Sequence, residues 1–141
     1  MQRGRRIAFD YGDVRIGVAI CDADGILASP LTTLQSTDKK LKNRLLEIFQ
    51  DIELIKIYIG KPSNMDGSSG SAVDKSLDFR DFIVTLTNLP IELIDERLST
   101  VSGVRSLRDS GVRSKESKSR IDEAAAVAIL EFALSIEKNR T

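Results

Sequence analysis

IAFDYGDVRIGVAIC, residues 7–21 of the chain, indicates the fold more directly than the rest of the sequence. Its two ends, residues 7–10 and 15–21, are rich in the apolar and β-branched residues typical of buried strands. The short connection between them contains Gly12, which favours a hairpin. Asp24-Gly25 is a turn signal, and a third strand is expected over residues 26–29. The chain should therefore open with three antiparallel strands.

Beyond this opening, helix and strand patterns alternate. Apolar spacing predicts helices over residues 41–52, 72–86, 100–108 and 119–137, and β-branched runs predict strands over 54–59 and 91–94. The polar segments 60–70 and 113–120 are expected to be loops. In the second helix the expected core positions are Val73, Leu77, Phe79 and Ile83. The order predicts an α/β fold: a mixed five-stranded sheet, three antiparallel strands then two parallel, flanked by helices. A length of 141 residues fits one domain, residues 1–141.

The most informative feature of the composition is that the chain has no histidine. This excludes catalytic triads that use histidine and the usual zinc sites. A single cysteine, Cys21, excludes an internal disulfide and a thiolate cluster. Catalysis would have to rest on groups such as carboxylates, and a carboxylate site suits hard cations such as Mg²⁺ or Mn²⁺.

The charge balance and hydropathy limit the partners. The chain has 21 Lys and Arg against 21 Asp and Glu, which argues against a protein that coats nucleic acid through bulk charge. Its longest unbroken apolar run, residues 124–130, is far shorter than the roughly 20 residues of a membrane span. The N-terminus lacks the apolar run of a signal peptide. We therefore expect a cytoplasmic protein without a membrane partner.

Three acids are the candidate catalytic residues. Asp10 and Glu96 each end an expected buried strand, and Asp122 lies at the centre of the apolar face of the last helix, in line with Ala126 and Ile129. Each has a simpler interpretation alone: Asp10 as a turn residue, Glu96 as a solvated acid, and Asp122 as part of a Ser119-x-x-Asp122 capping box. As a set, they could converge at one sheet edge and hold two metal ions, ~3.5–4 Å apart, beside a phosphodiester.

Other residues are candidates for binding substrate. The Gly- and Ser-rich segment 60–70 could bring backbone N–H groups close to a phosphate, or be only a surface loop. Arg15 and Arg97 could each hold phosphate in a forked geometry, or form an internal ion pair with a neighbouring carboxylate. Residues 105–120 carry a net charge of +4, six basic residues less two acids, which is compatible with a substrate contact by Lys118 or with a solvated surface.

Four segments resemble motifs of the YqgF/RuvX family. Residues 10–17 (DYGDVRIG) resemble its D-x-G-x-x-R-I-G opening, and residues 62–70 its P-x-x-M-D-G-S-x-G loop. Residues 95–100 resemble its D-E-R-L-[ST]-T motif. Ile121-Asp122 followed by Ala124-Ala125, then Ile129-Leu130, resembles its closing I-D-x-x-A-A helix. The matches occur in the family's order and cover nearly the whole chain. Lys61 departs from the pattern, because the family usually has an apolar residue before the proline.

The resemblance implies a ribonuclease H-like fold and a nuclease associated with maturing the 5′ end of pre-16S ribosomal RNA, and also with Holliday-junction resolution. It implies catalytic and metal-binding roles for Asp10, Glu96 and Asp122, with Mg²⁺ or Mn²⁺ as the cofactor. A fourth carboxylate, common among such nucleases, has three candidates here: Asp66, Asp95 and Glu123. The residues expected to contact substrate are Arg15, Lys61, Asp66, Gly67, Ser68, Arg97 and Lys118.

The expected partner is structured RNA, in ribosomal precursor particles, or alternatively branched DNA; the sequence does not define an oligomeric state. Two other classes compete with the nuclease. A non-catalytic nucleic-acid-binding module of ribosome assembly could keep the fold, although a complete set of carboxylates argues against it. A sugar kinase or actin-like ATPase also opens with an Asp- and Gly-containing hairpin, but it binds nucleotide between two domains, and this chain has room for one.

Overall fold

The opening strands form the antiparallel unit that the sequence predicts. The computed structural model describes residues 1–61, 71–96, 104 and 114–140, with the backbone alone for 71–73. Strand β1 (Arg5–Tyr11) pairs antiparallel with β2 (Arg15–Cys21), and β2 pairs antiparallel with β3 (Ala28–Gln35).

The third strand begins later and runs further than the predicted residues 26–29. The Asp22 carboxylate accepts hydrogen bonds from the backbone N–H groups of Ile26 and Leu27, at 2.7 and 3.0 Å. These bonds hold both residues in the turn, where their side chains are exposed. Strand β3 therefore starts at Ala28 and continues to Gln35, which pairs with Arg15.

The rest of the sheet is parallel. Strands β4 (Leu54–Lys61) and β5 (Ile91–Asp95) follow helices α1 (Leu41–Asp51) and α2 (Ser71–Val84), and the sheet order is β3-β2-β1-β4-β5. Strand β4 lies parallel to both β1 and β5. The predicted α/β class and mixed five-stranded sheet are confirmed.

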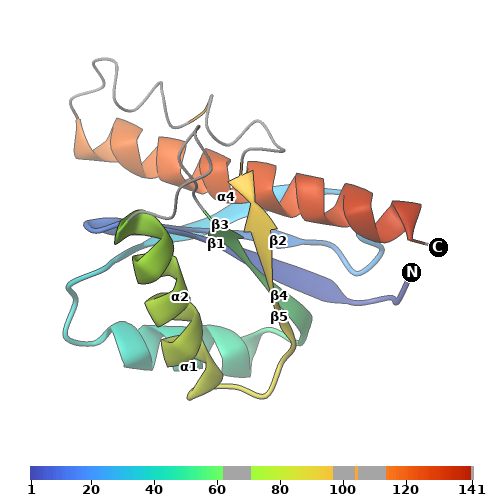
Figure 1. Ribbon diagram of the computed structural model, residues 1–141, viewed down its shortest axis with the longest axis horizontal. Helices are drawn as coiled ribbons and strands as arrows, with labels where there is room; N and C mark the ends of the chain where they lie inside the picture. Colours follow the sequence, from blue (N-terminus) through green and yellow to red (C-terminus); the bar gives the residue numbers. More distant parts are fainter. Residues whose placement is uncertain (62–70, 97–103, 105–113, 141) are drawn as a thin grey trace.

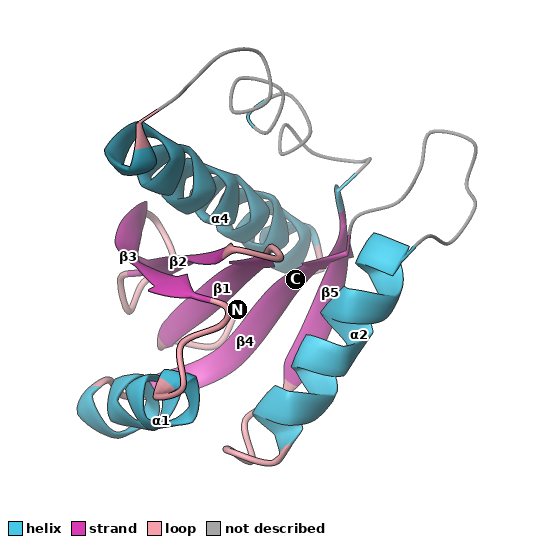
Figure 2. Cartoon of the chain, turned by 90° about the vertical axis from the view of Figure 1, so that its left-hand side faces the viewer, coloured by secondary structure: helices cyan, strands magenta, loops and turns pink. Residues whose placement is uncertain are grey.

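Helices cover both faces of the sheet. The long helix α4 (Lys115–Asn139) crosses one face, and α1 and α2 lie on the other (Figures 1 and 2). Side chains alternate between the two faces along each strand. In β1, Ala8 packs with α4, whereas Ile7 and Phe9 pack with α1 and α2. Asp10, two residues after Ala8, therefore belongs to the α4 face.

Two of the predicted core positions of helix α2, Phe79 and Ile83, are confirmed, and one, Leu77, is wrong. Its buried positions are Ser76, Phe79 and Ile83, whereas Leu77 is only half-buried. The side chain of Val73 lies outside the described residues. Phe79 sets this phase, because its ring stacks on Tyr11 with centroids 4.9 Å apart and meets Phe9 edge-on at 5.5 Å.

Helix α4 begins four residues earlier than predicted. Ser114 is its N-cap, and the Ser114 hydroxyl accepts a hydrogen bond from the N–H of Ser117 at 3.1 Å. The expectation of a loop over 113–120 is therefore wrong from Lys115 onward. The capping-box interpretation is wrong as well, because Ser119 and Asp122 lie inside the helix. The predicted phase of the helix is confirmed by its buried residues.

The predicted helix over 100–108 falls outside the described residues, apart from Val104. In the part of the chain that the structure describes, no helix combines the length and the apolar character needed to cross a bilayer.

A buried polar network fixes the end of α4 that lies far from Asp10. Arg6 in β1 is 0% exposed and makes two hydrogen bonds to the Glu137 carboxylate, at 3.0 and 3.2 Å. The Tyr58 hydroxyl donates to the same carboxylate at 2.5 Å. Burial would raise the pKa of Glu137, but the bonds from Arg6 and Tyr58 outweigh it and hold that pKa below its ordinary value.

Candidate active site

The candidate site lies at the end of β1, on the face that α4 covers. Asp10 is 3% exposed and stands opposite Gly17 of β2 in the antiparallel register. On its other side, one step beyond the Phe9–Ile59 pair, lies Gly60 of β4. Asp10 is thus flanked by two glycines, and the missing side chains leave room above the sheet for neighbouring groups.

Gly60 makes room for Glu96. A Cβ atom at Gly60 would collide with Oε1 of Glu96 and with Cδ1 of Ile129. Glu96 follows directly on β5 and is 4% exposed. Its carboxylate therefore extends from β5 over β4, toward the strand that carries Asp10.

Gly17 makes room for Asp122. A Cβ atom at Gly17 would collide with the backbone carbonyl oxygen of Asp122, so helix and strand approach more closely here than any other residue would allow. Asp122 is 1% exposed. The two glycines thus bring the backbone of Asp122 and the carboxylate of Glu96 to opposite sides of Asp10, so that β1, β5 and α4 each contribute an acid to one end of one face.

The Asp122 carboxylate is held by an arginine. Nε of Arg15, at the start of β2, donates to Oδ2 of Asp122 at 2.7 Å, and the Arg15 side chain is 16% exposed. Of the two interpretations of Arg15 from the sequence, the structure contains the internal ion pair with a neighbouring carboxylate.

The donor set suits a hard divalent cation in its chemistry, because Asp10 and Glu96 are buried carboxylates on the same face of the sheet and Gly60 leaves space for the Glu96 carboxylate. Within the described ranges, however, no three Asp, Glu, Cys or His side chains are grouped closely enough to hold one ion. Asp122 is the member of the expected set that is turned toward another cation, the Arg15 guanidinium.

The predicted substrate-binding residues are distributed around this edge. Lys61 follows Gly60 in β4 and pairs in register with Asp95, so strand alternation places both on the face opposite Asp10. Lys118 is half-buried and lies one helical turn before Asp122 in α4. Asp66, Gly67, Ser68 and Arg97 lie outside the described residues.

Two candidates for a fourth carboxylate point away from Asp10. Glu123 accepts a hydrogen bond at 2.6 Å from the hydroxyl of Thr33, in the edge strand β3. Asp95 belongs to the other face of the sheet, as its register with Lys61 requires. The third candidate, Asp66, lies outside the described residues.

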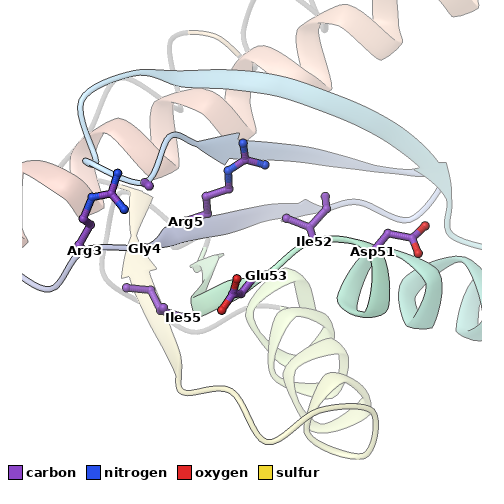
Figure 3. Close-up of a pocket in the computed structure, with 8 residues that line it drawn as sticks. Arg3, Gly4, Arg5, Asp51, Ile52, Glu53 and Ile55 are labelled. Carbon is purple, nitrogen blue, oxygen red and sulfur yellow. The ribbon is translucent and has the colours of Figure 1, made fainter.

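A hollow of about 350 Å³ lies at the opposite end of the sheet (Figure 3). Arg3 and Arg5 reach it from the start of β1 and the residues before it, and Asp51 and Glu53 from the end of α1 and the residues after it. Positive and negative side chains balance there, and Arg3 is paired with Asp24 at 3.1 Å. The hollow is separate from the three acids and offers no comparable group of buried carboxylates.

Comparison with known proteins identifies the family. The model of the RuvX family, described as Holliday junction resolvase, matches residues 4–136. The chain belongs to the RuvX family. A relative from Streptomyces avermitilis is 44% identical over 140 residues, covering 98% of this chain and 90% of the relative. Another from Mycobacterium ulcerans is 44% identical over 132 residues, covering 92% and 77%. Both carry the name "Putative pre-16S rRNA nuclease".

Solved structures show the fold of this RuvX-family chain independently. Thermus thermophilus RuvC in complex with a Holliday junction substrate matches with a TM-score of 0.59 at 12% identity, covering 95% of this chain and 96% of RuvC. A second RuvC structure gives 0.57. The ribonuclease H-like fold implied by the motifs is thereby confirmed.

The sequence reasoning missed the roles of Gly17 and Gly60, which create the space around Asp10 in this RuvX-family chain. A signal for them was available, because glycine in the interior of a strand often marks a close approach of another backbone or side chain.

Proposed function

We propose that this chain is a metal-dependent nuclease that processes the 5′ end of pre-16S ribosomal RNA, with Asp10, Glu96 and Asp122 as its catalytic residues. The observation that carries the proposal is that β1, α4 and the residue after β5 each place a buried acid at the same end of one face of the sheet. Its substrate follows the name shared by the relatives that are 44% identical.

Each acid has a distinct place in the proposed reaction. Asp10 and Glu96 would hold the metal, because both are buried carboxylates and the Glu96 carboxylate lies over Gly60, beside the strand that carries Asp10. Asp122 would complete the set from α4. A bound divalent ion such as Mg²⁺ or Mn²⁺ would supply a Lewis acid for the scissile phosphate and lower the pKa of a bound water. The burial of the acids keeps bulk water from screening their charge.

Basic residues near this edge would position the substrate. Lys118 lies one turn before Asp122, and Lys61 emerges from β4 directly after Gly60. Lys118 lies on the helix that covers the Asp10 face and would contact a phosphate close to the scissile bond, whereas Lys61 faces the other side of the sheet and would contact the substrate further away. The chain has no net charge that would attract nucleic acid as a whole, so local contacts of this kind would have to provide the affinity for the substrate.

A second candidate is Holliday-junction resolution, which the description of the family model favours. A symmetric four-way junction is cut at two equivalent positions, so this reaction would require two copies of the site related by a two-fold axis. The two candidates differ in substrate, and the same carboxylates would serve either one.

The test offers the purified protein two substrates in parallel with Mg²⁺: a 5′-extended 16S precursor RNA and a four-way DNA junction. The controls are EDTA and Asp10→Asn. A matched control is Asp13→Asn, because Asp13 is an exposed acid three residues away, paired with Lys75 at 2.8 Å.

Cleavage of the RNA alone, lost with EDTA and in Asp10→Asn but kept in Asp13→Asn, would support the proposal. Cleavage of the junction alone would favour Holliday-junction resolution as the function. Absence of both cleavages in folded protein would favour a non-catalytic nucleic-acid-binding module. Normal cleavage by Asp10→Asn would show that the acids have been assigned wrongly.

A further inference from the structure

The Asp122 carboxylate already has a cation beside it. Nε of Arg15 lies 2.7 Å from Oδ2 of Asp122, and the two side chains are 16% and 1% exposed. A charge-assisted hydrogen bond of this length is strong, and the low exposure of both groups reduces its screening by water. It differs from a surface ion pair such as Lys75–Asp13, whose side chains are 46% and 68% exposed.

The backbone fixes this pairing. Arg15 and Gly17 lie on the same face of β2, two residues apart, and Gly17 packs directly against the backbone carbonyl of Asp122. The contact sets the helix close to the strand at the level of Arg15. The ion pair therefore follows from how α4 sits on β2.

Arg15 is a positive charge at the end of the sheet where the three candidate acids lie. Asp10, Glu96 and Asp122 place three buried acids at this end of the sheet, and Arg15 supplies a positive charge. No three acids are grouped tightly enough to share an ion in the described part of the chain, and Asp122 is the one bound to the guanidinium.

We infer that Arg15 is a built-in counter-ion that a divalent metal must displace from Asp122, so that metal loading frees its guanidinium for a phosphate of the substrate. The inference rests on the proposed metal-dependent function. Arg15 acts through Asp122 and is a positioning residue: it holds the carboxylate while the metal is absent. Once displaced, its planar fork of N–H donors matches a phosphodiester oxygen pair.

A counter-ion and a purely structural arginine predict opposite changes in metal affinity when Arg15 is removed. If Arg15 competes with the metal for Asp122, its removal should tighten metal binding. The guanidinium nitrogen lies 2.7 Å from Oδ2 of Asp122, so its removal would take away the repulsion between Arg15 and an incoming cation. We therefore expect metal affinity to rise by about tenfold. If Arg15 only supported the local structure, its removal would leave metal affinity unchanged or lower it.

The experiment measures Mn²⁺ and Mg²⁺ binding by isothermal titration calorimetry. The variants are Arg15→Met, which removes the charge at similar length, and Arg15→Lys, which keeps it. Lys75→Met is the matched control, because it removes one positive charge from the same edge without touching Asp122. We expect tighter binding in Arg15→Met alone, with the other two variants within about twofold of the original protein.

A second measurement uses the unaltered chain, in case Arg15→Met fails to fold. In protein with ¹⁵N-labelled arginine, the Nε–H resonance of Arg15 should report its bond to Asp122. Titration with Mg²⁺ should move that resonance away from its position in the metal-free protein, because the bond from Nε to Asp122 is broken. A resonance unmoved at saturating metal would overturn the inference.

The outcomes separate this inference from the proposed function. Metal binding lost in Asp10→Asn but equal or weaker in Arg15→Met would keep the metal site and overturn the role of Arg15. Metal binding unaffected by Asp10→Asn would overturn the carboxylate assignment itself. Absence of metal binding in both the original protein and Arg15→Met would overturn the inference, and cleavage that persists in EDTA would overturn the metal-dependent function.

Discussion

Gly17 of β2 lies directly against the backbone carbonyl of Asp122 in α4. No side chain fits between them, so the distance between helix and sheet is set at the position where the candidate acids gather. The small residues around this contact serve the same close approach, since Ala8 and Ala19 of the sheet and Ala125 and Ala126 of α4 are all completely buried. The location of the site is thus a consequence of how closely α4 can pack.

The first prediction concerns Gly17→Ala. The added methyl would meet backbone atoms of Asp122, which cannot rotate away, so α4 must shift. Overpacking of this kind typically costs about 1–3 kcal/mol. We expect a loss of this size in the free energy of unfolding, measured with urea, together with reduced cleavage. A Gly17→Ala variant as stable as the original protein would contradict the proposed close contact.

The second prediction concerns Gly60→Ala. Its methyl would meet the ends of two side chains, the Glu96 carboxylate and Ile129, which can move more easily than backbone. We therefore expect a stability cost below about 1.5 kcal/mol. Metal binding and cleavage should fall more sharply, because Glu96 is pushed from its place. Calorimetric titration with Mn²⁺, compared with Gly17→Ala, separates the two effects.

The two glycines also show which parts of the site could not be predicted from the sequence. The strands of the opening hairpin were predictable because their apolar residues are nearly continuous, and the phase of α4 was predictable because its apolar face repeats at helical spacing. The position of Asp10 at the end of a buried run followed from the same pattern. Its glycine neighbours matter only through the strand register, which connects residues far apart in the chain.

The start of α4 shows a second reason for disagreement. Residues 115–118 are polar and resemble a loop, and Ser119-x-x-Asp122 resembles a capping box. The structure instead uses Ser114 as the cap, so the polar residues form the first turn of the helix. Local preferences could not choose between Ser114 and Ser119, because serine is equally favoured as a cap at either position. The hydrogen-bond partner that orients the Asp122 carboxylate is Arg15, which is 107 residues away in sequence.

The third prediction separates the two adjacent acids of α4. Glu123 is bonded to Thr33 in β3, whereas Asp122 faces Arg15 and β2. We expect Glu123→Gln to keep metal affinity and cleavage within about twofold, because its carboxylate is directed away from Asp10. Asp122→Asn should greatly weaken both. Equal losses in the two variants would make Glu123 the missing fourth ligand.

The last prediction concerns the opposite end of α4 and its dependence on pH. Replacing Glu137 with Gln removes the carboxylate that balances Arg6, a guanidinium with no solvent exposure. Removing one member of a buried ion pair leaves the other charge unbalanced and typically lowers the free energy of unfolding by about 3–5 kcal/mol. We expect a loss of this order at pH 7 in urea unfolding, measured against Glu92→Gln. Glu92 is the matched control because its pairs with Lys56 and Arg140 are partly exposed and should contribute less than about 1 kcal/mol.

The direction of the pH effect follows from the lowered pKa of Glu137, whose ordinary value is 4.5. Although burial alone would raise that pKa, the hydrogen bonds from Arg6 and Tyr58 lower it in the folded state. The stabilisation is therefore complete above pH 4.5 and is lost as the pH falls through the folded-state pKa. The stability gap between the original protein and Glu137→Gln should narrow over this acidic range. A gap that stayed constant down to the acid transition would show that the carboxylate contributes through its shape and not through its charge.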